Sequence, residues 1–233
     1  MFKPLWKYSK SLFNAVYPRI CAGCGTALRG SEDFICIGCE TELPYTYYWQ
    51  NPDNRLMMRF AGRVQLQMAC SLLHFKKQSI VQGLIHHIKY KRRTDIALSL
   101  GKMLGRYIHA SISDLPDLIV PVPLHAHRLK QRGYNQCDYI AQGLSEALRV
   151  PFRTDVLVRP LENISQTKKR KFERWENVSG IFAVRDPLPL KNKHVLLVDD
   201  VVTTGATAES CILALQQTEG VRVSFVALAT AVI

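Results

Sequence analysis

The stretch from His194 to Thr207 constrains the fold of this chain more than any other segment. Four consecutive apolar residues, Val195 to Val198, predict a short buried strand. Two adjacent acids, Asp199 and Asp200, follow at the point where we expect the strand to end. Residues 203–207 are small and hydroxyl-rich, and they lead into an apolar-periodic segment that is predicted to be helical. Because open parallel sheets bind ligands outside the carboxyl ends of their strands, the stretch predicts an α/β fold with a ligand site here.

The residues after the two acids have the composition of a phosphate-binding loop. They are Thr203, Thr204, Gly205, Ala206 and Thr207. At the start of a helix several backbone N–H groups converge, the threonine hydroxyls add donors, and glycine permits a positive φ. Carboxylates would repel the phosphate itself, so Asp199 and Asp200 are expected to serve paired sugar hydroxyls or a bound Mg²⁺. An ordinary strand-to-helix turn with an N-cap threonine is the alternative.

The order of these residues is similar to a known motif. Four apolar residues, two acids, two apolar residues and Thr-Thr-Gly-x-Thr resemble the phosphoribosyl-pyrophosphate (PRPP) motif of type I phosphoribosyltransferases. Neither the P-loop pattern nor the dinucleotide G-x-G-x-x-G pattern fits. The resemblance implies that Asp199 and Asp200 hold the ribose hydroxyls and that residues 203–207 hold the 5′-phosphate.

Two Cys-x-x-Cys pairs predict a metal site. The ligands are Cys21, Cys24, Cys36 and Cys39, with eleven residues between the pairs. Each pair has a glycine inside it or directly after it, so each can form a tight turn whose N–H groups stabilise the sulfur charge. Four thiolates leave no open coordination position, which predicts a structural zinc that this short segment needs in order to fold. A Cys₄ iron–sulfur site and unligated thiols are the alternatives.

Composition limits the class of protein. The 233 residues allow one large domain, or one domain with a small module. The balance of 31 Lys and Arg against 19 Asp and Glu gives a net charge of +12, which favours polyanions without choosing among nucleic acid, polyphosphate and a membrane surface. No apolar run is long enough for a transmembrane helix, and Lys7 and Lys10 interrupt the stretch that a signal peptide would need. We therefore expect a cytoplasmic protein whose cysteines are thiols or metal ligands.

Two segments flank the cysteine pairs. Residues 4–17 place apolar side chains along one stripe, which predicts an amphipathic helix that packs on the protein or lies on a membrane or a partner. Residues 43–60 are rich in aromatic and turn residues and are typical of a linker. The aromatic rings there are expected to pack against the neighbouring domain, and base stacking is the alternative.

The remaining pattern predicts alternating helices and strands. Apolar periodicity indicates helices at 79–91, at 95–112 and from Asn135 to about Leu148, and strands at 118–120, at 155–158 and, with alternating character, at 221–231. Basic, loop-like sequence lies between His125 and Asn135. Five basic residues occur in the seven positions from Lys168 to Arg174, a composition typical of a solvated loop.

The order of motifs along the chain resembles the ComF family, the competence-associated phosphoribosyltransferase-like proteins of bacteria. The motifs are the Cys₄ module, Ile-Lys-Tyr-Lys at 88–91, Val-Pro-Val-Pro-Leu at 120–124, Arg-Gly-Tyr-Asn-Gln at 132–136, Gln166-Thr167 with Arg174, Asn177 and Phe182, and the PRPP motif. After Lys91 the family commonly has a glycine, whereas Arg92 and Arg93 follow here, which we expect to affect a turn.

This resemblance implies a type I phosphoribosyltransferase-like α/β fold, with a mostly parallel sheet flanked by helices and a small N-terminal Cys₄ zinc module. The expected boundaries are 1–18 for the N-terminal helix, 19–45 for the zinc module and 46–233 for the phosphoribosyltransferase-like domain. The resemblance also implies a pyrophosphate-side loop with Pro123, Arg128 and Arg132, and a mobile lid at 165–178 with Lys168, Lys169, Arg170 and Arg174. The cations of both segments suit neutralisation of a diphosphate.

Three functions are compatible with these features. A PRPP-binding protein of DNA uptake would bind Mg²⁺ with PRPP, single-stranded DNA and a helicase of the uptake machinery. An active phosphoribosyltransferase would pass the ribosyl group to a nucleobase-like acceptor, and an adaptor would keep only a vestigial PRPP site. We favour the first, because no purine- or pyrimidine-recognition element is visible, and no residue is assigned a catalytic role.

Overall fold

The computed structural model describes residues 18–159 and 181–231. Its centre is a four-stranded parallel sheet with the strand order β1-β6-β5-β2. The strands are β1 (Ala69–Phe75), β2 (Leu118–Pro121), β5 (His194–Val202) and β6 (Arg222–Ala231). A second, antiparallel sheet pairs β3 (Leu157–Val158) with β4 (Ala183–Val184). The predicted helix over 4–17 and the predicted lid residues Lys168, Lys169, Arg170 and Arg174 lie outside the described residues.

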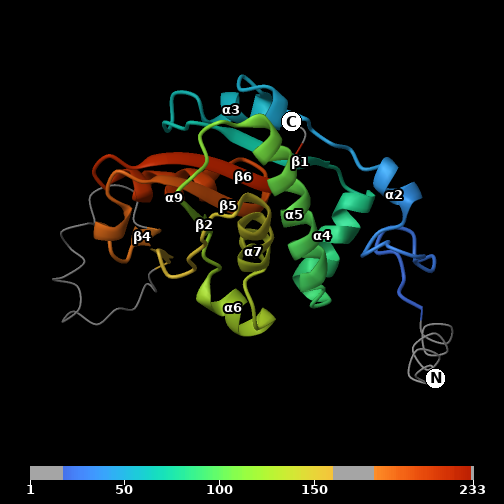
Figure 1. Cartoon of the computed structure of the whole chain (residues 1–233). Helices are drawn as coiled ribbons and strands as arrows, with labels where there is room; N and C mark the ends of the chain where they lie inside the picture. The colour runs from blue at the N-terminus through green and yellow to red at the C-terminus, as the bar shows by residue number, and fades with distance from the viewer. Residues whose placement is uncertain (1–17, 160–180, 232–233) are drawn as a thin grey trace, which may run out of the picture.

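Helices cover both faces of the parallel sheet (Figure 1). One face packs on α4 (Ile80–Tyr90), α5 (Thr94–Ser111) and α7 (Gln136–Leu148), and the other on α3 (Arg55–Phe60) and α9 (Ala206–Gln216). Leu196 and Val198 of β5 belong to the first core, and Val195 and Leu197 belong to the second. A strand that is buried on both faces needs a continuous apolar run, which is the pattern the sequence has here. The predicted fold class, an α/β fold with a mostly parallel sheet flanked by helices and an N-terminal four-cysteine module, is confirmed.

Some predicted elements differ in extent. The strand expected at 195–198 continues to Val202, because its pairing with β6 extends past the acids, with Asp199 opposite Ala227 and Val202 opposite Thr230. The strand at the C-terminal end of the chain lacks the predicted alternation, since β6 lies between β1 and β5 and is buried on both faces from Val223 to Thr230. Strand β1 was not predicted.

Two segments that were expected to be irregular contain helices. The basic, loop-like sequence after His125 forms α6 (Ala126–Arg132), which has no buried residue and therefore no apolar stripe that the sequence could reveal. Residues 43–60 are not a free linker. They form η1 (Tyr48–Gln50) and α3, and the Trp49 ring stacks on Tyr107 of α5 with centroids 4.6 Å apart, so the predicted aromatic packing is confirmed. The remaining short elements are α2 (Ile37–Thr41) and η2 (Leu188–Leu190).

The neighbouring strands β2 and β5 are parallel, but the segments that follow them lead to opposite sides of the sheet. After β2 the chain passes through α6 and α7 and returns at Phe152, which pairs in parallel with Ile119 on the outer side of β2. After β5 it passes through α9 to β6 on the opposite side. Open α/β sheets bind ligands at such a switch point, outside the carboxyl ends of the two strands.

Candidate functional site

A cavity of about 200 Å³ opens at this switch point, and we call it the inner cavity. Residues 122–125, which follow β2, line one side, and Asp199, Asp200 and Val201 of β5 line another. The N-terminal end of α7 closes a third side with Asn135 and Gln136. Asn135 caps α7 by accepting from the Cys137 N–H and also donates to the Val122 carbonyl over 3.1 Å, which ties the helix to the end of β2.

Asp200 is held by charged and polar partners. Lys89 Nζ, from the end of α4, lies 2.8 Å from Asp200 Oδ2, and Gln136 Nε2 donates to the same oxygen over 2.8 Å. The other oxygen accepts from the Val201 N–H over 2.6 Å. The residue is only 5% exposed. A buried carboxylate is stable when it is paired and hydrogen-bonded, so these contacts hold the Asp200 side chain in place.

Asp199 has weaker support. Its Oδ1 accepts from the Asp200 N–H over 2.8 Å and lies 3.6 Å from the buried Cys137 thiol. Burial, followed by repulsion from the Asp200 carboxylate, raises the pKa of Asp199 to about 7. The two neighbouring acids therefore differ: one is neutralised by a lysine, and the other holds a proton more readily than an ordinary aspartate.

A second, smaller hollow of about 40 Å³ adjoins the acids. Asp199 and residues 201–208 line it, and α9 begins at Ala206 on its rim. Gly205 has a φ of +86° and is buried, and a Cβ at this position would lie 3.1 Å from Phe60 Cε1. The loop therefore needs glycine both for its backbone conformation and for its contact with α3.

Arg59 of α3 holds this loop in place through hydrogen bonds. Its guanidinium donates to the Thr203 carbonyl, to the Ala231 carbonyl over 3.1 Å and to Thr230 Oγ1 over 3.4 Å. Since Thr203 follows β5 and Ala231 is the last residue of β6, the arginine links the loop to the carboxyl ends of both strands. Such a preformed loop keeps its N–H groups at the helix start in place for an anion.

The structure brings most of the predicted site residues together. Pro123, Arg128 and Arg132, predicted on the pyrophosphate side, line the inner cavity together with the two acids and Thr207. The other predicted phosphate-loop residues line the adjoining hollow: Thr203, Thr204, Gly205 and Ala206. The carboxylates and the loop therefore share one continuous edge of the sheet, although they are not adjacent to the cations in sequence.

Three residues of this region had no predicted role. Lys89 and Gln136 hold Asp200, and Arg59 holds the loop. Lys89 and Gln136 occur in the motifs at 88–91 and 132–136, so their motifs were visible although their contact with Asp200 was not. The expected turn after Lys91 is present, because Arg92 has a φ of +54°, a conformation in which glycine is favoured.

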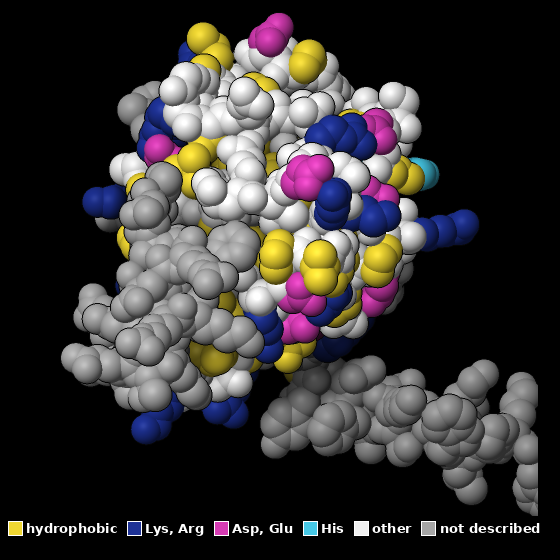
Figure 2. Space-filling model, turned by 90° about the vertical axis from the view of Figure 1, so that its left-hand side faces the viewer, with side chains coloured by type: hydrophobic (Ala, Val, Ile, Leu, Met, Phe, Trp, Pro, Cys, Tyr) yellow, Lys and Arg dark blue, Asp and Glu magenta, His cyan; other side chains and the backbone are white. Residues whose placement is uncertain are grey.

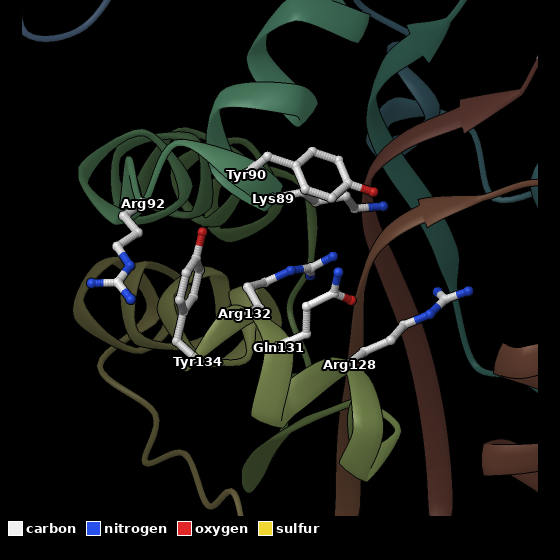
Figure 3. Close-up of a pocket in the computed structure, with 7 residues that line it drawn as sticks. All are labelled: Lys89, Tyr90, Arg92, Arg128, Gln131, Arg132 and Tyr134. Atoms are coloured by element: carbon white, nitrogen blue, oxygen red, sulfur yellow. The ribbon is translucent and has the colours of Figure 1, made fainter.

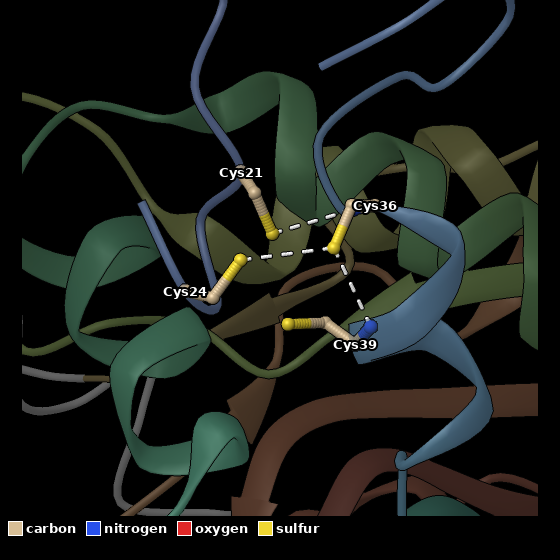
Figure 4. A group of neighbouring side chains, drawn as sticks. All are labelled: Cys21, Cys24, Cys36 and Cys39. Carbon is tan, nitrogen blue, oxygen red and sulfur yellow. Dashed lines mark hydrogen bonds between the residues drawn. The ribbon is translucent and has the colours of Figure 1, made fainter. Parts of the chain in front are cut away.

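The four cysteines of the N-terminal module converge (Figure 4). Their sulfur atoms all lie within 4.8 Å of one another, so the cluster can hold a metal ion. Cys24 Sγ and Cys36 Sγ are 3.7 Å apart, close to the edge of about 3.8 Å that four sulfurs at 2.3 Å from a tetrahedral zinc would have. The N–H groups of Gly23 and Cys36 each donate to Cys21 Sγ over 3.3 Å. Contacts from Thr26 lower the pKa of Cys24 to about 6, which favours the thiolate.

Charge is mixed over one large face of the molecule. Figure 2 shows Lys and Arg side chains interspersed with Asp and Glu on that face. None of the helices within 18–159 and 181–231 combines the length and apolar character that a membrane crossing requires.

The chain is similar to several curated proteins, whereas no protein-family model matches it. It is 37% identical over 128 residues to the DNA utilization protein YhgH of Escherichia coli K12, which covers 53% of this chain and 56% of that protein. It is 26% identical over 209 residues to competence protein F of Haemophilus influenzae, which covers 80% of this chain and 86% of that protein. Competence protein ComFC of Bacillus subtilis is 35% identical over 41% of this chain and 38% of its own length. The chain thus spans about half the length of the first of these relatives.

One solved structure with partial similarity is the adenine phosphoribosyltransferase of Leishmania tarentolae. It has 16% identity and a TM-score of 0.37, and the match covers 76% of this chain and 88% of that one. The sequence relatives carry the comparison instead: the match with competence protein F covers 80% of this chain, and the match with ComFC covers 41% of it. These relatives support an assignment of the chain to the ComF family.

Proposed function

We propose that this chain is a PRPP-binding, phosphoribosyltransferase-like protein that acts in DNA uptake. One observation at the switch point carries the proposal. The half-buried Asp199 and the buried Asp200 adjoin a phosphate-sized hollow at the start of α9. The names of the relatives, which refer to competence and to DNA utilization, support the cellular role.

In this proposal each part of the site binds one part of the ligand. Asp199 and Asp200 accept hydrogen bonds from the paired ribose hydroxyls, and residues 203–207 bind the 5′-phosphate. Arg128 and Arg132, on the other side of the inner cavity, bind the diphosphate. A Mg²⁺ ion bound with the ligand would neutralise part of the diphosphate charge. Lys89 balances Asp200, so the ribose hydroxyls meet acceptors of reduced net charge.

The roles of the acids and the loop are separable by titration calorimetry with PRPP, ribose 5-phosphate and inorganic phosphate. Replacing both acids, Asp199→Asn with Asp200→Asn, is expected to weaken the two sugar ligands about ten- to hundred-fold, while phosphate binds at least as well. Gly205→Val is expected to weaken all three ligands, because the side chain crowds the loop and disfavours its φ. Gly30→Val is the control, since Gly30 also has a positive φ (+53°) but lies in open space away from the site.

Two results would contradict this assignment. One is the absence of PRPP binding by the unmodified protein. The other is that the double Asn variant loses binding of inorganic phosphate as well as of PRPP, while the unmodified protein binds Mg²⁺ without any ligand. That result would make the two acids a metal site. Thermal unfolding of each variant shows whether it has folded.

A transferase that passes the ribosyl group to a nucleobase-like acceptor is the alternative function of the same site. The cations of the inner cavity would then stabilise the departing pyrophosphate. Release of pyrophosphate on mixing the protein with PRPP and nucleobases would favour this reading over binding alone.

We also propose that the cysteine cluster holds a structural zinc and that residues 19–45 form its module, ahead of a phosphoribosyltransferase-like domain over 46–233. The sulfur spacing and the N–H groups directed at the sulfurs support this proposal. Binding of single-stranded DNA and of a helicase partner remains part of the proposed role, supported by the net charge of +12 and by the names of the relatives.

A further inference from the structure

A larger cavity, of about 370 Å³, adjoins the proposed PRPP site, and we call it the outer cavity. It is formed where the end of α4 faces α6 (Figure 3). Its lining includes four cations and two tyrosines: Lys89, Arg92, Arg128, Arg132, Tyr90 and Tyr134. Lys89, Arg128 and Arg132 also line the inner cavity, so the two cavities adjoin, whereas Tyr90, Arg92 and Tyr134 belong to the outer one alone.

The outer cavity carries an excess of positive charge. No carboxylate is among those of its lining residues that the structure describes. Lys89 is paired with Asp200, and Arg132 contacts the Gln136 side-chain oxygen. For Arg92 and Arg128 the described part of the chain provides no ion pair. Figure 3 shows Arg92 and Arg128 at opposite sides of the cavity, with Arg92 on the side of Tyr134, so each guanidinium would meet a phosphate separately.

Aromatic surface lies directly beside these cations. The Tyr90 side chain is 66% exposed, and the Arg132 guanidinium carbon is 5.5 Å from its ring centroid. Tyr134 is fixed, because its hydroxyl donates to the Ile88 carbonyl. An exposed tyrosine ring next to an arginine plane is the combination on which nucleobases stack.

The backbone places Arg92 at this cavity at some cost. Its φ of +54° is a left-handed conformation that L-residues seldom adopt. The turn is secured by the contact of Tyr134 with Ile88 and by the N–H of Thr94, which donates to the Arg92 carbonyl over 2.9 Å. Strained residues of this kind cluster at binding sites, where the surrounding structure holds them in place.

We propose that the outer cavity binds one nucleotide unit, with its phosphate on Arg92 and its base against Tyr90. The unit is a free nucleotide or one unit of a single strand, since both present the same phosphate and base. This site goes beyond the proposed PRPP site, and its binding does not depend on Asp199 or Asp200.

The test uses the full chain and residues that line only the outer cavity. The probes are thymidine 5′-monophosphate and a fluorescent oligothymidylate, measured by calorimetry and anisotropy. Tyr90→Ala is expected to weaken binding about five- to hundred-fold, and Tyr90→Phe is expected to preserve it, because the ring remains. Arg92→Gln is expected to weaken binding about ten-fold or more and to lower the salt slope for the oligonucleotide by about one.

Arg149→Gln is the matched control. Arg149 is also an exposed arginine with a positive φ (+58°), at the end of α7, but it lines neither cavity. Its replacement is expected to leave both probes and the salt slope unchanged. Thermal unfolding of all variants distinguishes a binding defect from a folding defect.

The pattern of results identifies the source of the nucleotide. If Tyr90→Ala and Arg92→Gln weaken both probes, the site accepts a single nucleotide; if they weaken only the oligonucleotide, it binds a unit of a strand. The proposal is overturned if neither variant changes either probe, or if both variants act only on PRPP. The two sites are distinct if these variants still bind PRPP and the Asn double variant does not. If the unmodified protein does not bind PRPP at all, the nucleotide measurements still test the outer cavity.

Discussion

Asp199 and Asp200 are adjacent in sequence but differ in their electrostatic surroundings. Asp200 has Lys89 and Gln136 as partners, whereas Asp199 receives a backbone N–H and contacts a thiol. Burial and the neighbouring carboxylate raise the pKa of Asp199 to about 7. A charged Asp199 is therefore a cost to the folded state, of the kind that binding sites retain for the sake of their ligand.

The residue-scale prediction concerns stability against pH. The folded-state pKa of Asp199 lies above its ordinary value of 3.8. The protonated side chain therefore contributes fully to stability below about pH 3.8, and this contribution is lost as the pH rises towards about 7. Asp199→Asn is therefore expected to raise the free energy of unfolding at pH 8 by roughly 1–3 kcal/mol, with little gain at pH 4. Urea denaturation at several pH values measures this. Asp200→Asn is expected to give no such gain, because it leaves Lys89 without its partner, and a gain of equal size in both variants would contradict the account.

At the scale of elements, α5 and α7 pack with their backbones in close contact. A Cβ on Gly143 of α7 would overlap the Leu98 carbonyl of α5, and one on Gly101 of α5 would overlap the Ile140 carbonyl of α7. This close packing sets the position of α7, whose first turn holds Gln136 against Asp200. Glycine, a poor helix former, is kept in these helices for contact rather than for flexibility.

Two matched substitutions test this contact. Gly143→Ala is expected to destabilise the protein by about 1–3 kcal/mol, because the helices must separate. Gly83→Ala, in the middle of α4 where a Cβ meets no atom within 4 Å, is expected to stabilise it by about 0.5–1 kcal/mol. Denaturant midpoints with unchanged slopes report both effects. A stabilising Gly143→Ala would show that the helices are not held this closely.

At the scale of the whole molecule, the cysteine module shares its core with the rest of the chain. Phe34 and Ile35 of the module are buried in the same cluster as residues of α4 and α5. A Cβ on Gly23 would lie 3.0 Å from Cys39 Sγ and 3.3 Å from Ile80 Cγ2, so the module meets α4 at the cysteine cluster itself. Loss of zinc is therefore expected to destabilise more than the module.

The two Cys-x-x-Cys pairs provide an internal control for this prediction. Gly23→Ala is expected to lower the zinc content and the Tm, whereas Gly38→Ala, at the equivalent position of the second pair, is expected to leave both unchanged because no atom lies within 4 Å of its Cβ. Elemental analysis and thermal unfolding with and without chelator provide the measurements. Cys36→Ser is expected to lower the zinc content further by removing a ligand. Full zinc occupancy in that variant, or a Tm indifferent to chelator, would exclude a structural metal.

The sequence by itself determined the features that are local. A buried strand, a helix start with small residues and a pair of Cys-x-x-Cys turns each depend on neighbours a few positions away, so their patterns are readable in the sequence. The order of these motifs was sufficient for the resemblance to the ComF family. The fold class followed because strands that are apolar throughout require helices on both faces.

Only the tertiary structure decided which distant side chains meet. The contact of Lys89 and Gln136 with Asp200 joins residues from two helices and a strand. Arg59 reaches the loop at 203–207 from a segment whose composition predicted a linker. Helix α6 was hidden because it buries no residue and so has no apolar periodicity. The outer cavity was hidden for a related reason: its cations and tyrosines come from the ends of separate elements, and their convergence depends on how α4 and α6 face each other across the sheet edge.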